Sequence, residues 1–325
     1  MNTARVTIHA SQFPENVRRD LLASLATRQV NHKFHYDSTR QTQRWLALHE
    51  AFSPARTNTD CLDTYEHAFN AAATHVTAKK IHLLGLGCGG GQKDTRLLQI
   101  LAAAGRELSY TPSDVSVAMT LVARQTALAV VADQDCFPFV CDLATADDLP
   151  AALDSQTPGG AARLVTFFGM IPNFEPADIL PRLAALVRPS DCLLFSANLA
   201  PGPDYAAGVR AILPQYDNAL TRDWLLAFLF DLGVESGDGE LRFAIVTGAT
   251  GLARVEAQFN FLRSRRLAVG ADEFQFAAGD TIRLFFSYRY TPGLIRSHLA
   301  RHHLAVDAEW ITQSGEEGIF LCRRI

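Results

Sequence analysis

The chain has 325 residues, of which 48% are hydrophobic and 20% are charged, and its formal net charge is −4. This is the composition of an ordinary globular protein, long enough for a large core and a second lobe. The slightly negative net charge lacks the excess of basic residues that is typical of nucleic-acid-binding proteins. We therefore expect a small-molecule substrate as the partner, and neither nucleic acid nor a membrane.

The six cysteines are scattered without a C-x-x-C pair, which argues against a disulfide framework and against a zinc site. The first residues lack a signal-peptide pattern, and no apolar stretch reaches membrane-spanning length without a charge. We therefore expect a cytoplasmic protein without a metal. The sequence does not indicate an oligomeric state.

Residues 1–60 carry helical patterns without an α/β rhythm and are too few to fold comfortably alone. Strand and helix patterns then alternate up to residue 199, with strands expected at 80–86, 108–113, 137–141, 163–169 and 191–198. Regular alternation of this kind predicts a parallel sheet with right-handed crossovers and helices on its faces.

After Leu199 the pattern changes: a helix is expected at 219–232, followed by β patterns at 253–262 and 265–277. In the closing stretch, a helix at 292–303 lies between strand-like runs at 283–290 and 318–323. Such an ending commonly adds the last antiparallel strands to a sheet. We therefore predict an α/β domain with a Rossmann-like sheet, formed by residues 61–199 and 285–325, and a smaller α+β lobe formed by residues 1–60 and 200–284.

The first expected strand runs into a glycine cluster that contains Gly85, Gly87 and residues 89–91, and a helical pattern resumes at Lys93. Glycine is required where a side chain would block a ligand or where φ must be positive. The helix that follows directs its amide donors at whatever occupies the turn. A nucleotide-type cofactor is the first hypothesis; a tight turn without a ligand is the alternative.

Two acidic strand ends narrow the type of cofactor. Asp114 ends the second strand pattern, where a carboxylate can accept hydrogen bonds from ribose hydroxyls, and Asp142 ends the third. The glycines do not follow the G-x-G-x-x-G order that holds a pyrophosphate in nicotinamide enzymes. A site with contacts for ribose and adenine but without a pyrophosphate motif fits S-adenosylmethionine better than NAD.

Several segments, in the same order, resemble the histidine-specific N-methyltransferase family of ergothioneine biosynthesis, whose members trimethylate the α-amino group of histidine with S-adenosylmethionine. Residues 33–37 (K-F-H-Y-D) resemble the family's K-W-F-Y-D, and residues 54–58 (P-A-R-T-N) its P-T-R-T-E. Residues 168–174 resemble G-S-T-I-G-N-[FL], and residues 287–290 (S-Y-R-Y) resemble S-x-K-[FY]. The resemblance implies a class I S-adenosylmethionine-dependent methyltransferase fold and covers nearly the whole chain.

The resemblance also implies roles for single residues. Gly85 and Gly87 would lie under the methionine part of the cofactor with Lys93 nearby, Asp114 and Val115 would hold the ribose, and Asp142 and Leu143 would frame the adenine. Asn173 would bind the acceptor's α-amino group, and Tyr36 and Tyr216 would grip its carboxylate. Tyr36 and Asn173 would thus act at the reacting nitrogen, which neutral amide and phenol groups can orient without stabilising its protonated form.

The side-chain pocket departs from the family. The family holds the imidazole of histidine with the glutamate and serine of an E-x-S segment, which here reads Phe285-Phe286-Ser287. A buried carboxylate on an imidazole N–H contributes a few kcal/mol of discrimination, and phenylalanine removes that contact. Histidine is therefore not the expected acceptor, and an amino acid or amine with an aromatic or apolar side chain fits better.

We therefore predict an N-methyltransferase that uses S-adenosylmethionine and has Phe285 and Ser287 in its acceptor pocket. One alternative is a natural-product methyltransferase with a nitrogen, oxygen or carbon acceptor that is not an amino acid. Another is a catalytically inactive homologue that still binds the cofactor. The retention of Tyr36, Asn173 and Tyr216 argues against the inactive homologue.

Overall fold

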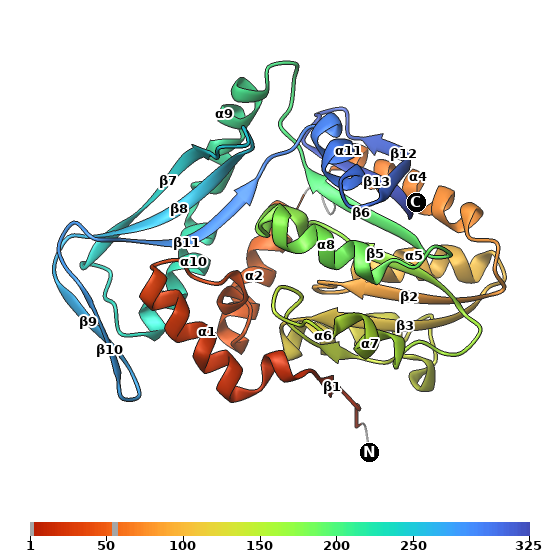
Figure 1. Ribbon diagram of the computed structural model, residues 1–325, viewed down its shortest axis with the longest axis horizontal. Helices are drawn as coiled ribbons and strands as arrows, with labels where there is room; N and C mark the ends of the chain where they lie inside the picture. The colour runs from red at the N-terminus through yellow and green to blue at the C-terminus, as the bar shows by residue number, and fades with distance from the viewer. Residues whose placement is uncertain (1–2, 54–57) are drawn as a thin grey trace. The chain divides into compact units, whose positions relative to one another are not determined.

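The computed structural model describes residues 3–53 and 58–325 (Figure 1). The chain divides into two compact units, each assembled from segments that are distant in the sequence. Unit 1 consists of Met1–Gln12, Pro54–Leu199 and Tyr290–Ile325, and unit 2 of Phe13–Ser53 and Ala200–Arg289. We describe each unit by itself.

Within its described residues, unit 1 forms an eight-stranded sheet in the order β1-β4-β3-β2-β5-β6-β13-β12. The strands from β1 to β6 pair in parallel, and β13 is antiparallel to both β6 and β12. In this spatial order the strands are β1 (Thr7–Ile8), β4 (Phe139–Val140), β3 (Glu107–Asp114), β2 (Lys80–Leu86), β5 (Ala162–Phe167), β6 (Cys192–Asn198), β13 (Glu317–Arg324) and β12 (Leu304–Ile311).

Helices cover the sheet of unit 1 (Figure 1). They are α4 (Thr59–His75), α5 (Gln92–Ala103), α6 (Val117–Ala127), α7 (Leu149–Asp154), α8 (Pro176–Leu186) and α11 (Pro292–Ala300), with the short helices η1 (Ala10–Gln12), η3 (Asp133–Asp135) and η4 (Ile171–Asn173). Phe69 of α4 and Leu97 of α5 pack in one core with strand residues such as Leu83 and Ile319. Because these strands are buried, their sequences are near-continuous apolar runs.

Unit 2 combines a three-stranded antiparallel sheet, in the order β11-β8-β7, with a hairpin and helices. Its strands are β7 (Gly239–Thr247), β8 (Ala253–Phe261), β11 (Thr281–Tyr288), β9 (Arg265–Val269) and β10 (Asp272–Phe276); its helices are α1 (Pro14–Thr27), η2 (His32–His35), α2 (Thr39–Phe52), α9 (Tyr205–Tyr216) and α10 (Ala219–Asp231). Trp224 and Phe228 of α10 pack against Phe34 of η2 and against Phe259 and Phe285 of the sheet. The core of unit 2 is therefore largely aromatic.

The predicted α/β fold with a mainly parallel sheet is confirmed. The structure differs from the expected boundaries in three places. Residues 58–60, where α4 begins, belong to unit 1 rather than to the smaller lobe. Residues 7–8 belong to unit 1, because β1 pairs with β4. The strand expected at 283–290 is β11, which belongs to unit 2 because it pairs with β8.

Other differences concern single strands. The β pattern at 265–277 is the hairpin β9–β10, which turns at Gly270 with a φ of 65°. The strands β7 and β12 were not expected from the sequence. Both carry many half-exposed or exposed residues, so neither has the continuous apolar run that marked β2.

Candidate active site

The glycine cluster forms a tight turn between β2 and α5. Gly87, Gly89 and Gly91 have φ values of 62°, 52° and 74°, a left-handed conformation that favours glycine. A Cβ on Gly87 would lie 2.6 Å from Cγ of Met170, and a Cβ on Gly91 would lie 2.7 Å from the Cα of Ala123. The turn therefore needs glycine both for its backbone angles and for its close neighbours.

Gly85 makes room for a buried carboxyl group. A Cβ on Gly85 would lie 2.1 Å from Oδ2 of Asp94. Asp94 accepts hydrogen bonds from the Tyr110 hydroxyl and the Thr166 hydroxyl, each at 2.7 Å. Burial raises the pKa of Asp94 to about 6. Gly85 therefore leaves the space that the Asp94 carboxyl group occupies.

Asp114 ends β3 beside the glycine turn. Its Oδ2 accepts the Gly89 N–H at 3.1 Å, and its Oδ1 accepts the Ser116 N–H at 3.0 Å. Burial raises the pKa of Asp114 to about 6, and the backbone N–H groups of Ser116, Gly89 and Val115 act in the opposite direction. Each carboxylate oxygen has a second lone pair, so Asp114 can still accept two hydroxyl protons from a ribose.

Asp142 and Leu143 follow β4, the next strand in the sheet. The Cys141 N–H donates to the carbonyl oxygen of Asp114 at 3.0 Å, which joins the two strand ends. Oδ1 of Asp142 accepts the Ala144 N–H at 2.9 Å and so shapes the turn. The glycine turn, Asp114 with Val115, and Asp142 with Leu143 thus meet at the carboxyl ends of β2, β3 and β4. Bare backbone, a carboxylate and apolar side chains fit a group with a ribose and a flat base.

The structure places Lys93 in a hydrogen-bond network that the sequence did not reveal. Its Nζ donates to the Tyr65 hydroxyl at 2.6 Å and lies 3.7 Å from Oε1 of Glu317. The Tyr65 hydroxyl also contacts Glu317 and the Ser196 hydroxyl, and Oγ of Ser196 accepts the Gly169 N–H at 2.9 Å. Burial and Glu317 raise the pKa of Tyr65, so it stays a phenol. The network links α5 to the turn that starts at Gly169.

Asn173 lies in η4, shortly after β5. Its backbone N–H donates to the carbonyl oxygen of Met170 at 3.0 Å, and the Met170 side chain lies against Gly87. A helix-capping role for Asn173 would be an ordinary alternative, but the N-cap of α8 is Glu175. The turn after β5 therefore carries Asn173 at the same sheet edge as the glycine turn.

In unit 2, the structure brings Tyr216 and Ser287 into direct contact. The Tyr216 hydroxyl donates to Oγ of Ser287 at 2.8 Å, and Nη2 of Arg289 donates to the Tyr216 hydroxyl at 2.6 Å. Arg289 is only 6% exposed. Arg289 was not among the predicted site residues, although it lies in the S-Y-R-Y segment, where the family has a lysine.

Further aromatic rings lie next to the contact between Tyr216 and Ser287. The ring centroid of Phe285 lies 6.1 Å from that of Tyr216 and 5.7 Å from that of Trp224. The Tyr36 ring lies 5.6 Å from Trp224 and 5.9 Å from Trp45. Three of the predicted acceptor residues, Tyr36, Tyr216 and Phe285, are therefore part of one aromatic cluster in unit 2, and Ser287 contacts it through the Tyr216 hydroxyl.

Neighbouring residues in β11 point to opposite faces of its sheet, as strand geometry requires. Phe285 pairs with Ala257 and packs in the aromatic core. Phe286 instead lies under the guanidinium groups of Arg254 and Arg283, each 4.9 Å from its ring centroid. Phe285, and not Phe286, therefore belongs to the aromatic cluster.

The K-F-H-Y-D segment is built into the core of unit 2. Nζ of Lys33 lies 2.5 Å from Oδ2 of Asp20, and Lys33 is almost completely buried. Nε2 of His35 bonds to the carbonyl oxygen of Leu284 at 2.7 Å, and burial lowers the pKa of His35 to about 4. These contacts fix the position of Tyr36. Residues 54–57 of the P-A-R-T-N segment lie outside the described residues.

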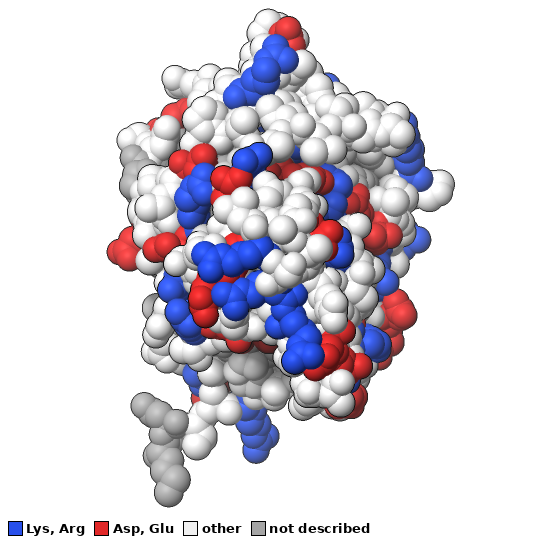
Figure 2. Space-filling view, turned by 90° about the vertical axis from the view of Figure 1, so that its left-hand side faces the viewer, with Lys and Arg blue, Asp and Glu red and all other residues white. Residues whose placement is uncertain are grey.

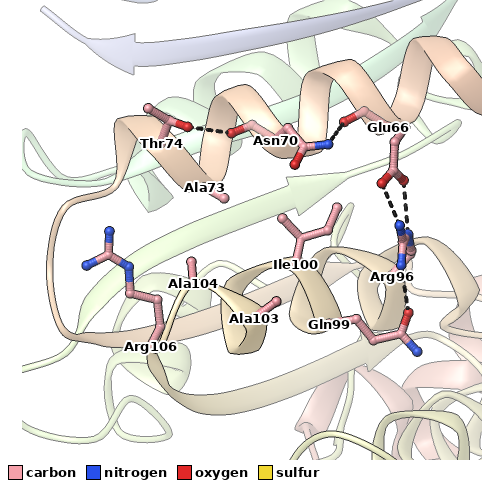
Figure 3. Close-up of a pocket in the computed structure, with 10 residues that line it drawn as sticks. All are labelled: Glu66, Asn70, Ala73, Thr74, Arg96, Gln99, Ile100, Ala103, Ala104 and Arg106. Atoms are coloured by element: carbon pink, nitrogen blue, oxygen red, sulfur yellow. Dashed lines mark hydrogen bonds and ion pairs between the residues drawn. The ribbon is translucent and has the colours of Figure 1, made fainter.

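Other surface features do not coincide with the predicted site. A groove of about 610 Å³ between α4 and α5 is bounded by the Glu66–Arg96 ion pair at one end and Arg106 at the other (Figure 3). None of the predicted cofactor or acceptor residues lines it. It is therefore separate from the glycine turn.

The basic run at residues 263–266 is balanced by acidic partners. Arg265 pairs with Asp238 and Glu235, and Arg266 pairs with Glu273. Figure 2 faces the side that carries the β9–β10 hairpin, and lysine and arginine alternate there with aspartate and glutamate. Within residues 3–53 and 58–325, no helix is both long and apolar enough to span a membrane. No cluster of three or more potential metal ligands occurs in the same part of the chain.

Known proteins resemble this chain. The family described as histidine-specific methyltransferase, SAM-dependent, matches residues 16–225 and 242–324. A histidine N-alpha-methyltransferase from Mycolicibacterium smegmatis is 26% identical over 337 residues, covering 97% of each chain. A solved structure of 1,6-didemethyltoxoflavin-N1-methyltransferase from Burkholderia thailandensis has 12% identity and a TM-score of 0.41, covering 100% of this chain and 93% of that one. The mitomycin 7-O-methyltransferase MmcR has 15% identity and a TM-score of 0.43, covering 97% of this chain and 70% of that one.

Proposed function

The chain belongs to the family of SAM-dependent, histidine-specific methyltransferases, and from this premise we propose that it methylates the amino group of a small amino acid or amine with an aromatic or apolar side chain, rather than histidine. It is an enzyme, and S-adenosylmethionine is its cofactor. The observation that carries the proposed acceptor is the position of Phe285 between the rings of Tyr216 and Trp224.

The residues of the glycine turn fit the cofactor. S-adenosylmethionine, when bound, supplies an electrophilic methyl group on a sulfonium. We assign the bare backbone at Gly87 to its methionine half, with Lys93 nearby, and the free lone pairs of Asp114 to its ribose. Leu143 and the turn at Asp142 would frame the adenine. Glycine at residues 85 and 87 keeps this turn compact, because side chains there would collide with Asp94 and Met170.

Asn173 and Tyr36 are the proposed residues at the acceptor nitrogen. An amide oxygen can accept an N–H of a neutral amine, whereas a carboxylate would stabilise the protonated ammonium, which has no lone pair to react. Orientation of the lone pair at near-attack distance accounts for a large part of the rate enhancement in such reactions. The proton released by the amine passes to water or to a nearby polar group.

The hydrogen bond between Tyr216 and Ser287 limits the number of protons that these two hydroxyl groups can donate to a bound acceptor. Arg289 donates to Tyr216, so one lone pair of that hydroxyl is occupied, and the Tyr216 proton is directed to Ser287. The pair can then donate one proton outward. Together with the positive charge of Arg289, this arrangement suits a carboxylate group of the acceptor.

The acceptor class can be tested with a ligand panel. Thermal-shift assays with S-adenosylhomocysteine, followed by phenylalanine, tyrosine, tryptophan and histidine, should give a shift with the cofactor product and a further shift with an aromatic amino acid. A cofactor shift together with a response only to amines that lack a carboxylate would favour the non-amino-acid alternative. Binding without methylation of any acceptor would favour the inactive homologue.

A designed substitution gives a sharper test. Phe285→Glu restores the E-x-S pattern, so we expect methylation of histidine to rise by about tenfold or more and that of the aromatic acceptor to fall by a similar factor, the size expected for one charged hydrogen bond. Phe286→Glu is the matched control, because residue 286 lies on the opposite face of the strand. A wild-type enzyme that preferred histidine over all three aromatic amino acids would contradict the proposed acceptor.

A further inference from the structure

The N-terminal strand extends the sheet of unit 1 beside the proposed cofactor site. Thr7 and Ile8 pair in parallel with Phe139 and Val140 of β4, and the His9 N–H donates to the carbonyl oxygen of Val140 at 2.9 Å. Since β4 leads directly to Asp142, residues 7–12 run alongside the strand end that carries the proposed adenine contacts. We call residues 7–12 the N-terminal strap.

Ser11 in the strap holds the turn at Asp142. Its Oγ accepts the backbone N–H of Asp142 at 3.0 Å, a contact between residues 131 positions apart. Nδ1 of His9 accepts the Ser11 N–H at 3.0 Å, so this nitrogen is unprotonated and the Ser11 hydroxyl proton points to it at 2.9 Å. Nε2 of His9 then donates to Oδ1 of Asp148 at 2.7 Å. These bonds direct the lone pairs of Ser11 toward Asp142.

Gln12, the last residue of the strap, holds the other turn. Its Nε2 donates to the carbonyl oxygen of Val115 at 2.7 Å, a contact between residues 103 positions apart. Val115 directly follows Asp114, the proposed ribose ligand. Two neighbouring strap residues thus bind the backbone of the two strand ends that follow β3 and β4.

We propose that the N-terminal strap positions the adenosine-binding turns of the enzyme, with Ser11 and Gln12 as positioning residues for the cofactor's adenosine half. The inference rests on the proposed cofactor site. Turns at strand ends are mobile unless their backbone groups are bound. By binding the Asp142 N–H and the Val115 carbonyl, the strap keeps both turns in the conformation that the ligand requires, so less order has to be imposed on binding.

The test compares two ligands and a matched control. Calorimetry would measure Kd for S-adenosylhomocysteine and for 5′-methylthioadenosine, which lacks the amino-acid half, with Ser11→Ala, Gln12→Ala and the wild type. We expect Kd to rise about fivefold for both ligands in each variant, the size expected for one neutral hydrogen bond. Arg5→Ala is the control, because Arg5 is exposed and precedes the strap, and its Kd should equal that of the wild type. Ser11→Thr, which keeps the hydroxyl, should restore binding.

The outcomes separate this inference from the cofactor assignment. Variants that melt earlier but keep the wild-type Kd would reduce the strap to a structural role and overturn the inference. A loss seen with S-adenosylhomocysteine alone would place the effect at the methionine half and would also overturn it. A wild type that bound neither ligand would remove the cofactor assignment itself. Gln12→Ala keeps the test decisive if Ser11→Ala fails to fold.

Discussion

Asp114 is a single residue that links the chemistry of the site to pH. Burial raises the pKa of its carboxyl to about 6, so the group changes charge close to neutral pH. Only the ionised carboxylate accepts two hydroxyl protons from a ribose without offering a competing donor. Acidification should therefore weaken cofactor binding.

We expect Kd for S-adenosylhomocysteine to rise about tenfold between pH 7 and pH 5, because roughly a tenth of a carboxyl with a pKa near 6 remains ionised at pH 5. Calorimetry at half-unit steps of pH would measure it. Asp114→Asn should bind weakly and show little change over this range. A pH dependence that survived in Asp114→Asn would point to Asp94, whose pKa is also about 6.

Ionisation of the Asp114 carboxyl lowers folding stability, whereas it strengthens cofactor binding. Folding raises the pKa of Asp114, so its contribution to folding is most favourable below the ordinary value of 3.8 and is lost as the pH rises through about 6. Ligand-free protein should therefore lose this part of its stability at the pH where cofactor affinity improves. Affinity and apoprotein stability can thus be separated by measuring both.

Among the structural elements, α5 depends on the glycine that precedes it. Gly91 is its N-cap, has a φ of 74°, and lies so close to Ala123 that a Cβ would be 2.7 Å from that residue's Cα. Gly105, two residues after the helix, has a similar φ of 75° but no atom within 4 Å of an added Cβ. A comparison of alanine substitutions at Gly91 and Gly105 therefore separates the free-energy cost of the left-handed backbone from the cost of a steric collision.

Gly105→Ala should lower the free energy of unfolding by about 1 kcal/mol, the cost of placing a Cβ in the left-handed region. Gly91→Ala should lower it by about 3 kcal/mol, because overpacking against α6 adds to that cost. Urea denaturation of both variants would measure the difference. Equal losses would show that α5 and α6 can separate to accept the methyl group.

The elements also show what the sequence can predict. The strand at residues 80–86 was predicted with the observed bounds, because a continuous apolar run ends in glycine there. The positions of Asp114 at the end of β3 and of Asp142 shortly after β4 could be predicted because each follows an apolar run, and their roles in the site stay predictions. β1 could not be predicted, because it has two residues with exposed side chains and exists only through its pairing with β4.

Contacts to distant backbone are equally invisible in a sequence pattern. Gln12 binds a carbonyl group 103 positions away, and nothing in its neighbourhood indicates this. The strand pattern at 283–290 was visible, but its partner was not, because alternation specifies the face of a strand and not the sheet it joins. Lys93 was predicted from its motif, whereas its partner Tyr65 lies in a helix whose apolar pattern gives no hint of a polar network.

In the whole molecule, the last strand along the chain is an interior strand of the sheet. β13 lies between β6 and β12, and Ile319 and Leu321 on it are part of the main core of unit 1. Removing residues 304–325, which deletes β12 and β13, should therefore prevent unit 1 from folding into a soluble form. Removing residues 1–6, which precede β1, should change the melting temperature little. Solubility and thermal melting of the two truncated chains would test this contrast.

The interior position of β13 also bears on how the protein is made. During synthesis β6 is complete while its neighbour β13 is still to be translated, so the growing chain presents an apolar strand with unpaired backbone groups on one side. Such an edge readily pairs with other chains. Slow translation of the final segment, or its loss through a premature stop, should therefore lead to aggregation rather than to a shorter working enzyme.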